Sequence, residues 1–115
     1  MLPDAGDIAW VAFDPVLGTE QAGRRPALIL SERSYHELST RAVVCPITKT
    51  RRDWPFDIPV PTGLKTSGFV LADQIRTIHR ASRIREHIEA APASLLLEVR
   101  GRLSALLGIR LETLS

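Results

Sequence analysis

The run "DIAWVAF" at residues 7–13 constrains the fold of this chain most, because apolar side chains occupy both of its alternating faces. A strand of this kind must be covered on both sides, which is typical of a central strand in a small barrel or sandwich. Asp14 and Pro15 end the strand, because proline cannot donate to a strand ladder. The rest of the chain must therefore supply neighbouring strands and covering layers.

Short apolar runs separated by turn residues predict those neighbouring strands; they are "PALIL", "AVVCPI", "FDIPV" and "FVLADQIRTI". Pro59 places the "FDIPV" strand at a sheet edge. The run "FVLADQIRTI" predicts either one long strand or two short ones. The pattern over residues 80–91 leaves both helix and strand open. Residues 32–38 predict a short helix capped by Ser31, with Tyr35 and Leu38 directed inward.

A longer helix is predicted near the C-terminus, beginning at Pro92 and ending at Gly108. Its apolar stripe consists of Leu96, Val99, Leu103, Leu106 and Leu107. Together these elements predict one domain over residues 1–115, mostly β with α. The expected fold is a mostly antiparallel sheet or small β-barrel of five to seven strands with a C-terminal helix.

Composition narrows the classes of function. The net charge of +2 does not by itself indicate a nucleic-acid partner. The single cysteine, Cys45, lies in an apolar run and is expected in the core of a protein from a reducing compartment, the cytoplasm. The sequence predicts no secretory leader, and it contains no apolar run near the ~20 residues of a membrane span. The three scattered histidines lack zinc spacing, and no phosphate-binding glycine motif occurs, so neither metal nor cofactor is expected.

The stretch "GTEQAGRRPALIL" gathers costly polar groups directly before an apolar strand. Glu20 and Arg25 flank Gly23, and a turn there would bring them together. Two other strand ends, in "ITKT" and "ADQIR", also carry polar side chains, so three strand ends could form a site on a rigid scaffold. The alternative interpretation is a solvated loop with an ordinary ion pair.

The chain resembles the MazF/PemK/Kid family of toxins from toxin–antitoxin systems, over roughly residues 6–109. The resemblance is carried by "GDIAWVAFDPVLGTEQAGRRPALILS", "VVCPITKT", "WPFDIPVP", "GFVLADQIRTI" and "VRGRLSALLG", and it is closest to the MazF branch. It implies an SH3-like or gyrase-poison-like small β-barrel that acts as a homodimer. It also implies a metal-independent endoribonuclease that cuts single-stranded RNA, often messenger RNA, halts translation, and is held by a cognate antitoxin with an extended acidic tail.

The family chemistry is attack of a ribose 2′-hydroxyl on the adjacent phosphate, which leaves a 2′,3′-cyclic phosphate and a 5′-hydroxyl. By motif match, Glu20 is the candidate base, and Arg25 would stabilise the charge growing on the phosphate. Thr48 would hydrogen-bond the phosphate or position the sugar, although a strand-end bond to the backbone explains it almost as well. The group that protonates the leaving 5′ oxygen stays open.

Residues implied in RNA binding are Gln21, Lys49, Arg51, Arg52, Trp54, Asp73, Gln74 and Arg76. The cations would neutralise phosphates and Trp54 would offer a stacking face, although a place in the core explains Trp54 slightly better. Thr19 and Leu71 replace a histidine and an arginine of some PemK/Kid members. Asp73 and Gln74 are therefore interpreted as base-recognition or scaffold residues.

Trp10 is expected in the core because of its strand, and Arg76 could instead make a structural ion pair. Two other functions are compatible with the predicted fold. A gyrase-poison-like toxin would bind a protein, and a non-cleaving family member would bind RNA or antitoxin only. The Glu20–Arg25 loop favours the nuclease, because a protein-binding poison does not need it.

Overall fold

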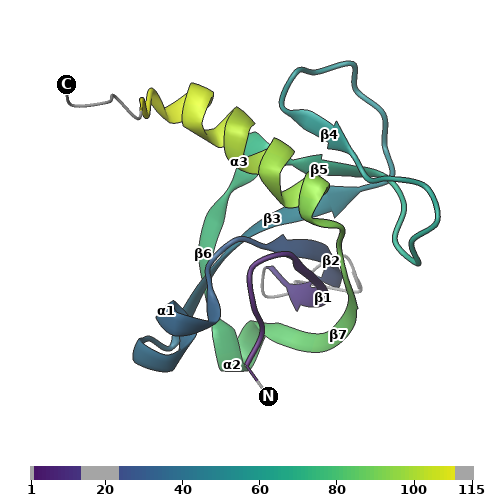
Figure 1. Cartoon of the computed structure of the whole chain (residues 1–115). Coiled ribbons are helices and arrows are strands. Elements are labelled where there is room, and N and C mark those ends of the chain that lie inside the picture. Colours follow the sequence, from purple (N-terminus) through teal and green to yellow (C-terminus); the bar gives the residue numbers. More distant parts are fainter. Residues whose placement is uncertain (1, 14–23, 111–115) are drawn as a thin grey trace.

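The structure is a computed structural model that describes residues 2–13 and 24–110 (Figure 1). The strands are β1 Asp7–Ala12, β2 Arg24–Ile29, β3 Arg41–Thr48, β4 Asp57–Pro59, β5 Phe69–Leu71, β6 Arg76–His79 and β7 Ile84–Ala90. The helices are α1 Arg33–Leu38, the 3-10 turn η1 Ala72–Gln74, α2 Arg80–Arg83 and α3 Ala93–Leu107. In that part of the chain, no helix is long and apolar enough to cross a membrane.

The strands form one antiparallel sheet in the order β4-β5-β3-β2-β1-β7, with β6 also paired to β3. The prediction that residues 7–13 form a central strand is confirmed, because β1 lies between β2 and β7. Pro59 lies in β4 at the sheet edge, also as predicted. The mostly β class with a C-terminal helix is confirmed, although the strand path is open rather than a closed barrel among the described residues.

Two segments that the sequence left open are now assigned. Residues 69–79 form two short strands, since η1 interrupts them between β5 and β6. Both strands pair with β3, one with each half of it. Residues 80–90 begin as the single turn of α2 and continue as β7.

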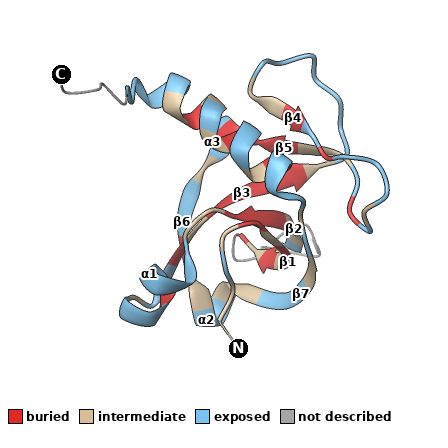
Figure 2. Cartoon of the chain, viewed as in Figure 1, coloured by how far each residue is buried: buried red, intermediate tan, exposed pale blue. Residues whose placement is uncertain are grey.

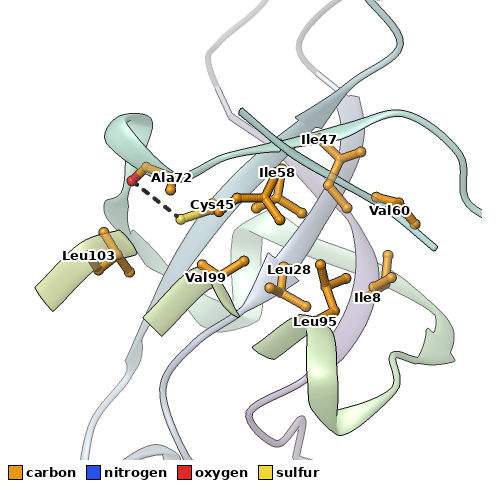
Figure 3. Packing of buried hydrophobic residues seen from close by; sticks show 11 residues of the cluster. Ile8, Leu28, Cys45, Ile47, Ile58, Val60, Ala72, Leu95, Val99 and Leu103 are labelled. Atoms are coloured by element: carbon orange, nitrogen blue, oxygen red, sulfur yellow. Dashed lines mark hydrogen bonds between the residues drawn. The ribbon is translucent and has the colours of Figure 1, made fainter. Parts of the chain in front are cut away.

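Side chains of the central strands alternate between two faces and pack into two separate apolar clusters. The first contains Ile8, Leu28, Cys45 and Ile47 and is covered by α3, whose Leu95, Val99 and Leu103 point into it (Figure 3). The second contains Val11, Phe13, Ala27, Ile29, Ala42, Val44 and Ile78. It is enclosed where β6, α2 and β7 run from β3 round to β1 (Figure 1). The two clusters explain why the central strand is apolar on both faces.

The predicted stripe of the long helix is wrong at its far end. Leu95 is buried and Leu96 only partly so, while Leu106 and Leu107 are exposed because the end of α3 extends past the sheet (Figure 2). The predicted stop at Gly108 is confirmed: its φ is +69°, and the next N–H, of Ile109, donates to the Ser104 carbonyl.

The predicted orientation of α1 is also wrong. Leu38 is 90% exposed and Tyr35 is exposed, whereas His36 is buried. His36 bonds the Pro3 carbonyl through Nδ1 (2.8 Å) and the Ser31 hydroxyl through Nε2 (2.7 Å). Ser31 also accepts the Val43 N–H and does not cap the helix. The short helix therefore docks through a buried polar residue rather than an apolar pair.

Gly68 brings β5 against the end of β3, and this contact suggests a test. Its φ is +122°, and a Cβ added there would lie 2.1 Å from the Thr48 carbonyl oxygen. We expect Gly68→Ala to destabilise the fold by about 3 kcal/mol or more, measured by chemical denaturation. Gly63→Ala is the control, because Gly63 also has a positive φ but open space around it. It should cost only about 1 kcal/mol. Equal losses for the two variants would contradict the close contact.

Cys45 offers a test of the first cluster. Burial, and then the negative charge of Asp73, raise the pKa of the Cys45 thiol from 9.0 to about 12. The unfolded thiol ionises first, so stability from the protonated folded thiol should be lost as pH rises from about 9 to 12. Denaturation across this range should show the loss in wild type and less of it in Cys45→Ala. A thiol reagent should label the native protein slowly at pH 8 and the denatured protein at once; rapid native labelling would contradict the burial.

Candidate functional site

The sequence-predicted catalytic residues lie partly in the segment between β1 and β2 and partly in the strands. Glu20 and Gln21 lie outside the described residues, so their predicted roles stay predictions. Arg25 is described and half-buried in β2, opposite Val11 of β1. Of the proposed catalytic pair, Glu20 and Arg25, the structure therefore describes Arg25.

Arg25 and Thr48 face the same side of the sheet. The pairing of β2 with β3 places Ala27 opposite Pro46, and continuing this register by two residues places Arg25 in line with Thr48. Thr48 in turn pairs with Phe69 of β5. Because partners in a row share a face of the sheet, Arg25, Thr48 and Phe69 face the same side. Arg25 and Thr48 therefore share one face of the sheet, and the convergence of these strand ends on one site stays a prediction.

Arg76 lies on this same face. It pairs with Val44 of the second apolar cluster, and its guanidinium lies 5.4 Å from the centre of the Phe13 ring. It also donates to the Phe13 carbonyl at 3.3 Å. Arg76 therefore stands beside the point where β1 gives way to the segment that carries Glu20. Two cations, Arg25 and Arg76, thus share the face of the sheet where that segment begins and ends.

Ion pairs hold the basic loop between β3 and β4. Arg52 donates twice to Asp57, at 2.7 and 2.6 Å, and the Asp57 side chain is only 3% exposed. The bond with Asp57, although opposed by partial desolvation, raises the pKa of Arg52. Arg51 pairs with Asp53 at 3.2 Å, and the φ of Asp53 is +45°. Arg51 is solvent-exposed. Arg52 is bound to a nearly buried carboxylate, so its first role is to stabilise the loop.

Trp54 is a partly exposed residue that contacts with its neighbours hold in place. It is 48% exposed, which corrects the slightly favoured expectation of a buried lid. Its Nε1–H donates to Asp73 at 2.7 Å, and its ring packs 5.9 Å from that of Phe56. Arg102 of α3 donates to the Pro55 carbonyl and fixes the same loop. An exposed ring on a fixed base is the form expected of a stacking platform.

A cavity of about 300 Å³ lies between the basic loop, Trp54 and the face of the sheet that carries Phe69. Its lining residues are Arg51, Arg52, Asp53, Trp54, Asp57, Pro59 and Phe69. Asp73 supports Trp54, so the scaffold interpretation of Asp73 gains weight. Gln74 is exposed next to it.

Thr48 Oγ1 accepts the Thr50 N–H at 3.2 Å, which is the strand-end bond considered as its alternative role. That bond leaves the hydroxyl hydrogen of Thr48 available to a phosphate oxygen.

Lys49 is the predicted residue that the fold separates from this group. It follows Thr48 and lines a different cavity, on the opposite face of the sheet, together with Trp10. Trp10 itself is half-buried rather than in the core, and the guanidinium of Arg24 lies 4.8 Å from its ring centre. Sequence reasoning missed Arg24, although the doubled arginine in "GRRP" marks it. Within residues 2–13 and 24–110, no group of His, Cys, Asp and Glu could hold a metal ion.

Comparison with known families matches residues 4–107 to the PemK-like, MazF-like toxins of type II toxin–antitoxin systems. The chain therefore belongs to this family. The endoribonuclease toxin MazF of Escherichia coli K12 is 37% identical over 108 residues, covering 93% of this chain and 96% of the relative. The endoribonuclease PemK of Escherichia coli is 35% identical over 108 residues, covering 90% and 81%.

Solved structures agree with this assignment. MazF from Deinococcus radiodurans superposes with a TM-score of 0.85 at 44% identity, covering 95% of this chain and 99% of that one. A crystal structure of MazE–MazF from the same organism gives a TM-score of 0.83 at 40% identity, with 96% and 99% coverage. The fold described above is thus that of the family.

The Arg52–Asp57 pair predicts how the basic loop is fixed. Asp57→Asn keeps the shape of the side chain but removes the charge that holds the Arg52 guanidinium, so the loop should loosen and the thermal midpoint should fall. Asp53→Asn is the matched control, because Asp53 and its partner Arg51 are both exposed and asparagine tolerates a positive φ. Equal midpoints for the two variants would show that Arg52 needs no buried partner.

Proposed function

We propose that this chain is a sequence-specific, metal-independent endoribonuclease toxin that cuts single-stranded RNA, including messenger RNA, and so inhibits translation. The observation that carries the proposal is that Arg25 and Thr48, near the ends of neighbouring strands, face the same side of the sheet. The Trp54 cavity lies on the same face, and Arg76 stands where the segment bearing Glu20 begins. The relatives named endoribonucleases support the same activity.

The reaction starts when the 2′-hydroxyl of one nucleotide attacks its own 3′ phosphate. Glu20 takes the proton from the hydroxyl as the new 2′ oxygen–phosphorus bond forms. The phosphorus–5′ oxygen bond breaks, and the departing oxygen takes a proton to become a 5′-hydroxyl. Arg25 presents paired donors to the phosphate oxygens as negative charge grows on them, and Thr48 adds a neutral donor. Arg25 works by electrostatics, because a guanidinium is a poor proton donor.

The assembly that we propose is a homodimer with RNA in a groove across its interface. Exposed apolar side chains on α3 and just after it support a covered surface: Leu97, Leu107 and Ile109 are each more than half exposed. A cognate antitoxin would occupy the same groove with an acidic tail, in keeping with the family and with the solved MazE–MazF complex of its relative. The protein would act in the cytoplasm, where messenger RNA is translated.

Cleavage of end-labelled single-stranded RNA in EDTA tests the proposal. Wild type should yield 2′,3′-cyclic phosphate and 5′-hydroxyl ends, and Arg25→Ala should lower the rate constant about 10²- to 10³-fold, because one preorganised donor is lost. Arg33→Ala, which removes the same charge from exposed α1, should cut at the wild-type rate. Intact RNA with wild type and Arg25→Ala alike would favour a protein-binding poison or a non-cleaving member of the family.

A further inference from the structure

A second cavity of about 300 Å³ lies on the face of the sheet opposite Arg25 and Thr48. Its floor is a row of the same strands, in which Trp10 pairs with Pro26, and Ile47 continues the row on β3. These residues alternate with the Arg25 row, one position away on each strand, and therefore point to the other side. The cavity is thus separate from the candidate catalytic face, but it is built on the same strand ends.

A loop fixed in place forms one wall of this cavity. The Glu89 carboxylate accepts the backbone N–H groups of Lys65 at 2.9 Å and Thr66 at 2.8 Å. Burial opposes ionisation of Glu89, but these bonds and the Lys65 charge outweigh it and lower the pKa of Glu89. Thr66 is 6% exposed, and its hydroxyl lies near Glu89 but has no well-formed hydrogen bond within the described residues. The wall is therefore preformed and holds an unsatisfied polar group.

The charges around the cavity favour an anion. Lys49 and Lys65 are the only two lysines in the chain, and both line it. Arg24 lies over the Trp10 ring and pairs at 3.4 Å with Glu86. Glu86 and Glu89 are thus already engaged, by Arg24 and by the loop. A planar ring, apolar walls and two ammonium groups together match a nucleotide, since the base can stack and the phosphate can be neutralised.

We propose that this Trp10–Lys65 cavity is a subsite for a nucleotide of single-stranded RNA that flanks the cleaved linkage. The proposal rests on the proposed nuclease function and adds to it a second contact point. The two faces meet at one edge, because Lys49 follows Thr48 and Ser67 precedes the Gly68–Phe69 turn that packs on Thr48. An RNA strand held at the Arg25 face can pass over this edge, place a base against Trp10, and set its phosphate between Lys49 and Lys65.

The two tryptophans of the chain allow a direct test, because Trp10 and Trp54 line different cavities. In Trp54→Phe, fluorescence reports on Trp10 alone, and in Trp10→Phe on Trp54 alone. A short 2′-deoxy oligonucleotide, which lacks the attacking hydroxyl, separates binding from cutting. We expect it to quench Trp10, and we expect Lys65→Ala and Lys49→Ala each to weaken binding and to reduce the salt dependence of log affinity by about 0.7.

Arg41→Ala is the matched control, because it removes one positive charge from the opposite end of β3 and should leave both quantities unchanged. Lys65→Arg should restore binding. In wild type, the oligonucleotide should protect Lys49 and Lys65 from acetylation, with the N-terminal amine as reference. Circular dichroism melts of each variant identify any loss of folding, and the acetylation pattern needs no substitution at all.

The outcomes separate this inference from the proposed function. If wild type cuts RNA while Trp10 is not quenched and both lysines stay reactive, the subsite is overturned and the nuclease stands. If an acidic peptide quenches Trp10 and the oligonucleotide does not, the cavity binds protein and the subsite is likewise overturned. If the oligonucleotide quenches Trp10 and protects the lysines but wild type leaves RNA intact, nucleotide binding at this cavity stands, while the nuclease and the role of the subsite beside a cleaved linkage are overturned.

Discussion

The pairing of β2 between β1 and β3 is the constraint on which the rest of the structure depends. Side chains on a strand alternate between faces, so this single register assigns every residue of the three strands to one side or the other. Leu28 enters the cluster under α3, while Ala27 and Ile29 enter the second cluster. The same alternation sends Arg25 to one face and Pro26 to the other. A slip of one residue would exchange both cores and both cavities at once.

Polar contacts position three segments that border the two cavities. Asp57 holds Arg52, Asp73 holds Trp54, and Glu89 holds the loop at Lys65. Each acceptor is a carboxylate that bonds a donor on a neighbouring segment, which is the strong class of hydrogen bond. These contacts make the cavity walls rigid without enlarging the apolar core, as a binding site on a small domain requires.

The arginines that follow β5 divide between structure and surface. Arg80 donates to the carbonyls of His36 and Ser39, and Arg83 donates to that of Ala12. These contacts tie α2 to α1 and to β1, so both arginines satisfy backbone acceptors instead of forming solvated charge. Charge counted along a sequence therefore overstates what is available to an RNA. The lysines differ, since both of them line one cavity.

The amino-acid sequence by itself determined the local choices: the doubly apolar central strand, the proline-bearing edge strand, the glycine stop of α3 and the family motifs. These follow from backbone geometry and short-range pattern, which need no knowledge of distant neighbours. Only the tertiary structure decided that His36 would be buried instead of Tyr35, that Trp10 would line a cavity, and that Lys49 would face away from Arg25. Each of these depends on which strand lies alongside and in what register, and pairing between residues far apart in the chain is the part of folding that local sequence does not encode.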